Sequence, residues 1–164
     1  MEPKANILVL GVGNLLLQDE GAGVRALEVF ARTYTVPDGV ELLDGGTSGL
    51  DLLHHIEGRD CLVILDVVKS GKPAGTLVRL EAEQVPALLD RKISPHQLGL
   101  SDLLAIARLT DTMPEKLVLL GVEPKSFDTG LEMSEEVGGC LEGLAAMLAG
   151  ELGALGVEVQ KLPE

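Results

Sequence analysis

Three residues from separate parts of the chain could together bind a metal ion: Glu20, Asp66 and His96. Two carboxylates and an imidazole suit a divalent ion such as zinc, nickel, manganese or iron, and they do not select strongly among these metals. The set contains no thiolate and has fewer ligands than the closed, four-ligand site of a structural zinc. Water or a substrate would therefore complete the metal's coordination. A further acid, Asp44, follows another strand-like segment.

Each of these residues could also have a purely structural role. Glu20 can stabilise the helix that follows it, because acids interact favourably with a helix N-terminus. Asp44 precedes two glycines, where an aspartate often bonds its own backbone in a turn. A lone histidine such as His96 is usually not a ligand. A structural role is hardest to assign to Asp66, since it interrupts the apolar run 62–68 and a buried carboxylate needs partners or a metal.

The segment 11–24, GVGNLLLQDEGAGV, looks at first like the glycine loop of a nucleotide-binding fold. The dinucleotide motif needs a third glycine at position 16, where this chain has Leu16. The first two glycines alone fit any tight turn from a strand into a helix. Two acids, Asp19 and Glu20, then stand where a phosphate would be expected. We therefore predict that this turn presents Glu20 rather than binding a phosphate.

Apolar runs and helical periodicity alternate along the chain. The predicted strands are 7–11, 40–43, 61–68, 76–80 (at an edge) and 117–122, and the predicted helices are 23–33, 49–56, 97–109 and 137–155. Ser134 is predicted to cap the last helix. Continuous apolar strands need cover on both faces, so we predict a three-layer α/β/α sandwich with a twisted, mostly parallel sheet of about five strands. The three acids and His96 would then converge beyond the carboxyl ends of the strands.

Composition sets limits on partners and location. The 164 residues are most simply one α/β domain, 1–164. A net charge of −13 argues against partners such as nucleic acid and anionic membranes, which bind cationic surfaces. Cys61 and Cys140 form no disulfide or metal motif and are expected to be buried thiols in a reducing compartment. No signal peptide and no apolar stretch of about 18 residues is visible, so we expect a cytoplasmic protein.

Four motifs together resemble one known family. They are GVGNLLLQDEGAGV, LDGGTSGLDLL, ILDVV and ISPHQLGLSDLL. They look like those of the hydrogenase maturation endopeptidases, which process the large subunit of nickel–iron (NiFe) hydrogenases. The patterns GNxLxxDEGxGV and SPHQxGL are highly specific when they occur together, and the resemblance runs from about Ile7 to the last helix.

The resemblance implies a metal-dependent, aspartyl-type endopeptidase that removes a C-terminal peptide from the large-subunit precursor after nickel insertion. By position, Glu20, Asp66 and His96 correspond to nickel ligands. Asp44 corresponds to a residue tied to substrate recognition or cleavage, and it joins these three as an expected catalytic residue. Because cysteine thiolates of the precursor would hold nickel far more tightly, we expect the nickel to come with the substrate and no tightly held cofactor in this chain. The chain has no GxSxG or HExxH motif.

Two other functions are consistent with the residues alone. A non-enzymatic nickel checkpoint or chaperone module would bind the loaded precursor and leave its C-terminus intact. A nucleotide-binding Rossmann-like enzyme would bind NAD or NADP at the GVGN turn. For the peptidase, a monomer that admits a large precursor is expected.

Overall fold

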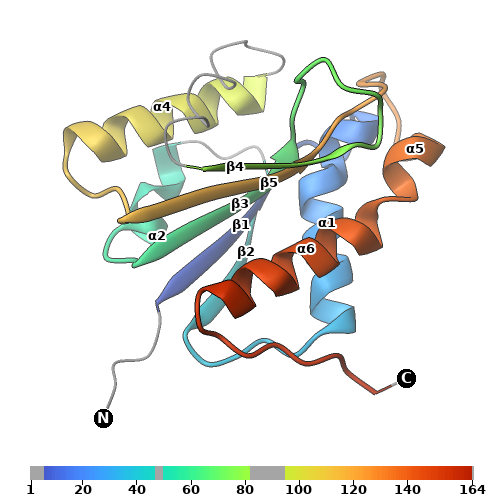
Figure 1. Ribbon diagram of the computed structural model, residues 1–164. Helices are drawn as coiled ribbons and strands as arrows, with labels where there is room; N and C mark the ends of the chain where they lie inside the picture. The colour runs from blue at the N-terminus through green and yellow to red at the C-terminus, as the bar shows by residue number, and fades with distance from the viewer. Residues whose placement is uncertain (1–5, 47–49, 82–94, 164) are drawn as a thin grey trace.

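A five-stranded sheet forms the centre of the molecule (Figure 1). The computed structural model describes residues 6–46, 50–81 and 95–163, with the backbone alone at 50, 95–99 and 101. The strands are β1 (Ile7–Val12), β2 (Val40–Gly46), β3 (Cys61–Val67), β4 (Leu77–Glu81) and β5 (Lys116–Val122). Their order is β2-β1-β3-β5-β4; the first four in this order are parallel, and β4 runs antiparallel at the edge. The predicted mostly parallel sheet and its edge strand are confirmed.

Helices cover both faces of this sheet. They are η1 (Gln18–Gly21, a 3-10 helix), α1 (Ala22–Thr33), η2 (Leu50–Leu52, also 3-10), α2 (Leu53–Ile56), α4 (Pro95–Leu109), α5 (Glu135–Gly138) and α6 (Leu141–Ala154). Figure 1 shows α1 and α6 on one face and α2 and α4 on the other. The predicted three-layer sandwich is therefore confirmed.

Two hydrophobic clusters, one on each face, account for the continuous apolar strands. In β3, Val63 and Leu65 point into the cluster shared with α1 and α6, whereas Leu62 and Ile64 point into the cluster shared with α4. Because side chains alternate along a strand, a strand covered on both faces has no polar side. Residues two apart on a strand share a face, so Asp66 lies on the same face as Leu62 and Ile64. This is the face that α4 covers.

The last predicted helix is broken into two. The prediction of one helix from 137 to 155 is wrong, because α5 ends at Gly138 and α6 begins at Leu141. Gly139 and Cys140 separate them, and Gly139 follows a second glycine at the end of α5; glycine is a poor helix former. The predicted cap is confirmed: the Ser134 hydroxyl accepts a hydrogen bond of 3.3 Å from the Val137 N–H.

The helix predicted over 49–56 is also shorter and less regular than expected, since residues 50–56 form one 3-10 turn followed by one α-helical turn. Adjacent residues on a helix normally point in different directions, but the His54 and His55 rings lie 4.0 Å apart. The two rings therefore lie side by side on this single α-helical turn.

The segment 135–154 has the length and apolar composition of a helix that could cross a membrane, with a mean hydropathy of 1.2. The prediction that no stretch of the chain qualifies is therefore wrong by this measure. Within the segment, Leu144, Leu148 and Leu152 are fully buried in the cluster shared with α1 and the sheet. Packing of α6 in the core thus accounts for its apolar character.

Candidate active site

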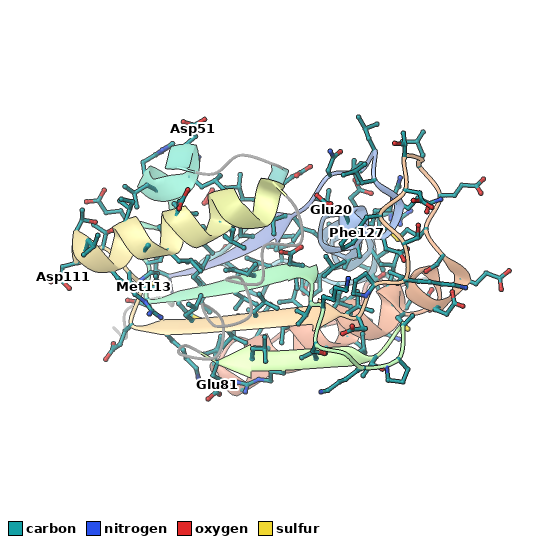
Figure 2. The ribbon with its side chains drawn as sticks, turned by 90° about the horizontal axis from the view of Figure 1, so that it is seen from above. Glu20, Asp51, Glu81, Asp111, Met113 and Phe127 are labelled. Atoms are coloured by element: carbon teal, nitrogen blue, oxygen red, sulfur yellow. The ribbon has the colours of Figure 1, made fainter. Side chains whose placement is uncertain are left out.

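The predicted site residues whose side chains are described come from elements that meet at the carboxyl edge of the sheet. Glu20 lies in η1, which contacts β3, while Asp66 lies within β3 itself. Asp44 lies near the end of β2 and is paired in register with Gly11 of β1. Figure 2 shows Glu20 at this end of the molecule and Met113, which precedes β5, at the other. The three acids therefore lie on elements that meet at one edge of the sheet, and their joint role with His96 stays a prediction.

Close backbone packing after β1 places Glu20. Gly13 has φ +135°, and a Cβ atom there would lie only 1.9 Å from the Glu20 carbonyl oxygen. A side chain at position 13 would therefore displace Glu20. The turn is closed by the Asn14 Oδ1 atom, which accepts a hydrogen bond of 2.9 Å from the Leu16 N–H. Glu20 itself is 1% exposed, and the N-cap residue of α1 is Gly21.

The glycine at the start of α1 lets that helix lie directly on the sheet. A Cβ atom on Gly23 would lie 2.1 Å from the Leu65 carbonyl oxygen and 2.6 Å from that of Val12. The glycines of the GVGN segment and of α1 thus serve contacts between protein backbones. This packing fits the predicted tight turn and gives the phosphate interpretation no support.

Asp66 is completely buried, as predicted from its place in an apolar strand. Its Oδ1 atom accepts a hydrogen bond of 2.7 Å from the Val67 N–H. On β5 it is paired in register with Gly121, where a Cβ atom would come within 2.9 Å of the Asp66 carbonyl oxygen. Burying a carboxylate in this position is costly, and a nearby cation would offset the cost.

Asp44 is exposed, unlike the other two acids. Its Oδ1 atom accepts a hydrogen bond of 2.9 Å from the Gly46 N–H, and Gly46 has φ +50°. This is the turn chemistry expected of an aspartate before two glycines. The turn also abuts the GVGN segment, since the Gly13 N–H donates to the Gly46 carbonyl over 2.8 Å. Asp44 therefore lies beside the turn that places Glu20.

His96 lies in the first turn of α4, which begins at Pro95, two residues earlier than predicted. Proline is favoured at the start of a helix because it lacks the N–H that would have no partner there. Figure 1 shows that α4 begins above the carboxyl edge of the sheet. The His96 side chain lies outside the described residues. Among the side chains that are described, no three His, Cys, Asp or Glu residues cluster as a metal site, so the predicted three-ligand set stays a prediction.

Two further buried acids at this edge, Glu123 and Asp19, were not predicted to be site residues. Glu123 follows β5 and accepts hydrogen bonds from the Ser70 N–H and hydroxyl, each 2.8 Å, and from the Gly71 N–H at 3.2 Å. Asp19 is fully buried beside Glu20. Glu123 could have been identified from the sequence, because it is an acid directly after an apolar strand. An acid interrupting an apolar strand is the pattern that identified Asp66.

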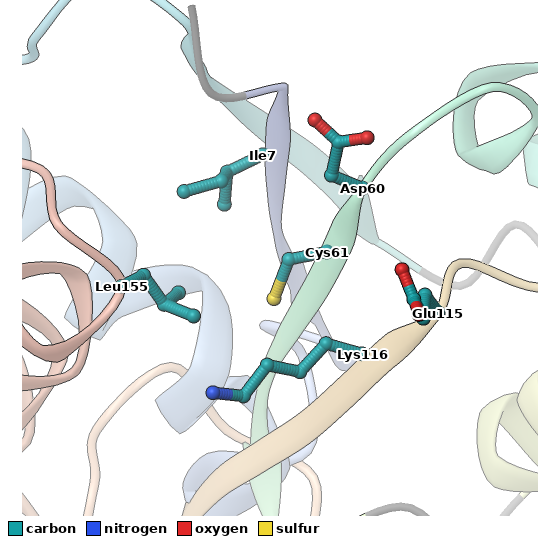
Figure 3. A pocket seen from close by; sticks show the side chains of 6 residues that line it. All are labelled: Ile7, Asp60, Cys61, Glu115, Lys116 and Leu155. Atoms are coloured by element: carbon teal, nitrogen blue, oxygen red, sulfur yellow. The ribbon is translucent and has the colours of Figure 1, made fainter.

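A cavity of about 470 Å³ lies at the opposite, amino edge of the sheet (Figure 3). Cys61 and Lys116, the first residues of β3 and β5, are among the residues that line it. Burial raises the pKa of the Cys61 thiol to about 11, so this thiol stays protonated near neutral pH. Cys140 is partly exposed, so the prediction of buried thiols holds for Cys61 alone.

Comparisons with known proteins agree on one family. The family profile HycI, hydrogenase maturation protease, matches residues 24–151. The chain is 47% identical to the hydrogenase 2 maturation protease of Escherichia coli over 153 residues, which is 93% of each chain. It is 43% identical to the hydrogenase expression/formation protein HupM of Azotobacter chroococcum, covering 93% of this chain and 74% of HupM.

Solved structures give the same result. The hydrogenase maturating endopeptidase HybD from E. coli matches with a TM-score of 0.91 and 44% identity, over 95% of this chain and 97% of HybD. A hydrogenase 2 maturation peptidase from a Thaumarchaeota archaeon matches with a TM-score of 0.70 and 30% identity, over 93% and 99% of the two chains. With its fold, its motifs and these relatives in agreement, the chain belongs to the hydrogenase maturation protease family and is a hydrolase of the endopeptidase type.

Proposed function

We propose that this endopeptidase removes the C-terminal peptide from the precursor of a NiFe hydrogenase large subunit, and that nickel already bound to the precursor is its recognition element. The observation that carries the proposal is the placement of two buried carboxylates, Glu20 and Asp66, at the carboxyl edge of the sheet. Similarity to the E. coli hydrogenase 2 maturation protease over 93% of both chains supports a hydrogenase as the target.

The donor set fits a metal ion that the substrate brings. Glu20, Asp66 and His96 would contact the nickel, while the precursor's thiolates would remain its stronger ligands. A nickel ion held there can polarise the scissile carbonyl or lower the pKa of a bound water. The cation would also offset the cost of burying Glu20 and Asp66, which are 1% and 0% exposed.

Asp44 has a different role in this proposal. Its side chain is exposed and lies on the strand next to β1, beside the turn that precedes Glu20. We therefore assign Asp44 to contact with the precursor chain near the cleaved bond rather than to the metal.

Mass spectrometry of a nickel-loaded precursor after incubation with this protein tests the peptidase activity directly. We expect the precursor to lose a C-terminal peptide, and the nickel-free precursor to stay intact. An unchanged mass of the loaded precursor, together with stable binding, would favour the non-enzymatic checkpoint module instead.

Dialysis of the purified protein against a chelator tests where the nickel resides. Because three oxygen and nitrogen ligands bind nickel more weakly than thiolates do, we expect no stoichiometric nickel to remain in the absence of precursor. Retention of one nickel per chain after dialysis would show that the protein carries its own metal.

A further inference from the structure

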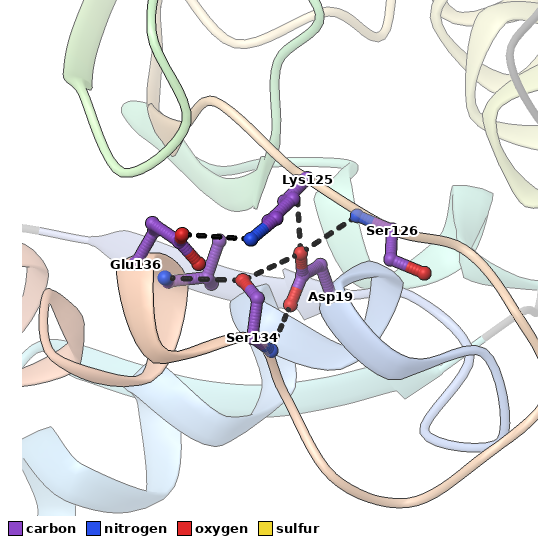
Figure 4. Close-up of polar contacts among 6 residues, drawn as sticks. Asp19, Lys125, Ser126, Ser134 and Glu136 are labelled. Atoms are coloured by element: carbon purple, nitrogen blue, oxygen red, sulfur yellow. Dashed lines mark hydrogen bonds and ion pairs between the residues drawn. The ribbon is translucent and has the colours of Figure 1, made fainter.

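The carboxylate of Asp19 is fully buried, and both of its oxygens accept hydrogen bonds (Figure 4). Its Oδ2 atom accepts from the N–H groups of Lys125 and Ser126, at 2.8 and 2.9 Å, and from the Ser134 hydroxyl at 2.9 Å. Its Oδ1 atom accepts from the Ser134 N–H at 2.8 Å. All four donors belong to the segment 125–134, which leads from β5 to α5. One side chain thus joins η1 to a part of the chain more than one hundred residues away.

Backbone hydrogen bonds join the same two segments. The Gln18 N–H donates to the Gly130 carbonyl over 2.9 Å, and the Gly130 N–H donates to the Leu16 carbonyl over 2.8 Å. The Asp19 N–H donates to the Ser126 carbonyl over 3.1 Å. Gln18 has φ +44°, a conformation that side-chain-bearing residues rarely adopt and that persists only when surrounding contacts fix it. The turn before Glu20 is therefore held by the segment 125–134 in addition to its local bond between Asn14 and Leu16.

We propose that Asp19 is a positioning residue, which holds η1 so that the neighbouring Glu20 is presented at the carboxyl edge of the sheet. The inference rests on the proposed function of Glu20. The two adjacent acids then have separate tasks, because the Asp19 oxygens are occupied by four donors of the fold. Ser134 takes part twice, since its hydroxyl also accepts from the Val137 N–H and caps α5.

Asp19→Asn is the decisive variant, because an amide keeps the size of the side chain and loses one acceptor. In either orientation of the amide, its NH₂ group would face a donor from the segment 125–134. Misplacement of a reacting group by about 1 Å costs about 100-fold in rate, so we expect kcat/KM for precursor cleavage to fall by about 10- to 100-fold. The assay temperature is one at which circular dichroism shows each variant to be folded.

Glu151→Gln is the matched control. Glu151 is a buried acid of α6 whose carboxylate binds Arg79 of β4 through two hydrogen bonds, 2.8 and 2.9 Å long. It anchors a different pair of elements, so this variant should lose stability and keep its kcat/KM when folded. An equal loss of kcat/KM in folded Glu151→Gln would assign the effect of Asp19→Asn to general destabilisation and overturn the proposal.

A double-mutant cycle separates positioning from an independent role. If Asp19 acts through Glu20, adding Asp19→Asn to Glu20→Gln should reduce kcat/KM by less than about threefold further. Full additivity of the two losses would contradict the proposal.

Backbone amide NMR spectra provide a test that does not depend on catalysis. We expect the Gln18–Gly21 cross-peaks to shift in Asp19→Asn and to stay in place in Glu151→Gln. Unchanged cross-peaks in Asp19→Asn would overturn the proposal even if activity fell.

A wild-type rate for Glu20→Gln would instead remove the proposed function of Glu20. If Asp19→Asn does not fold, Ser134→Ala removes one of the four donors and should shift the same cross-peaks by a smaller amount.

Discussion

At the scale of single residues, the acids at the carboxyl edge of the sheet differ in what holds them. Asp19 and Glu123 accept several hydrogen bonds from neighbouring loops and fasten those loops to η1 and β5. Asp66 is buried within β3, and Asp44 is exposed at the end of β2. The presence of an aspartate or glutamate in this region is therefore not enough to make it a catalytic candidate. The burial of its carboxylate and the hydrogen bonds that this carboxylate accepts decide which role it can have.

The proposed metal contacts predict the effect of three substitutions. Glu20→Gln, Asp66→Asn and His96→Ala should each lower kcat/KM for precursor cleavage by at least about 100-fold, or about 2.7 kcal/mol, because each removes a ligand that the nickel would contact. Circular dichroism should show a folded protein in each case. Glu28→Gln makes the same chemical change on the exposed surface of α1 and should cleave like the wild type. Wild-type rates in all three site variants would disprove the assignment.

At the scale of elements, the contact between α1 and the sheet depends on the lack of a side chain at Gly23. The substitution Gly23→Ala would place a Cβ atom 2.1 Å from the Leu65 carbonyl oxygen. We expect a loss of about 1–3 kcal/mol or more in the free energy of unfolding, since α1 must move away from the strands.

Gly150 provides the matched comparison, because it is also helical and a Cβ atom there meets nothing within 4 Å. Gly150→Ala should raise the free energy of unfolding by about 0.5–1 kcal/mol, because alanine has the higher helix propensity. Urea unfolding measures both variants. Equal effects of the two substitutions would show that the close approach at Gly23 does not control stability.

A second contact between elements predicts a pH dependence. The Arg79 guanidinium of β4 holds the pKa of Glu151 on α6 below its ordinary value of 4.5. A carboxyl whose pKa is lowered by folding stabilises the protein above its ordinary pKa, and this contribution is lost as the pH falls through the lowered value. Arg79→Met should therefore cost about 1–3 kcal/mol at neutral pH, a range that allows for the partly exposed Arg79 side chain.

Urea midpoints measured at several pH values check this prediction. The difference between wild type and Arg79→Met should narrow as the pH falls below 4.5. Lys125→Met breaks an exposed pair with Glu136 and should change stability little at any pH. A difference for Arg79→Met that stays constant down to low pH would contradict the role of Glu151.

At the scale of the whole molecule, the two edges of the sheet have different chemistry. The carboxyl edge carries the buried acids Asp19, Glu20, Asp66 and Glu123, while the amino edge has the cavity beside Cys61. Because burial raises the pKa of the Cys61 thiol to about 11, almost none of it is present as thiolate near neutral pH. Burial and location both argue against Cys61 as the nucleophile of the peptidase.

Cys61→Ala should therefore retain precursor cleavage within about threefold of wild type. The native thiol should also react slowly with an alkylating reagent and rapidly once the protein is unfolded, whereas the partly exposed Cys140 should react in the native state. Loss of cleavage in a folded Cys61→Ala protein would require a role for the amino edge in the reaction.

The sequence predicted the sheet well because β1, β3 and β5 are buried on both faces, and a short, continuous apolar run is typical of such a strand. Prediction was weaker for residues 135–155. There the spacing of the leucines indicates a face to be buried, but it runs on through Gly138 and Gly139, where the poor helix propensity of glycine interrupts the helix. Asp66 could be identified because it interrupts an apolar strand. Asp19 could not be separated from Glu20, since its donors come from residues 125–134.

The sequence by itself determined the layered fold and the family, together with the candidate acids Glu20, Asp44 and Asp66. These follow from hydrophobic periodicity and from motifs in which neighbouring residues carry the information. Tertiary structure alone decided which of the two acids in the Asp19–Glu20 pair serves as an anchor, and that the glycines of the GVGN turn lie against protein backbone. Both depend on contacts between distant segments, and local sequence does not encode the geometry of such contacts.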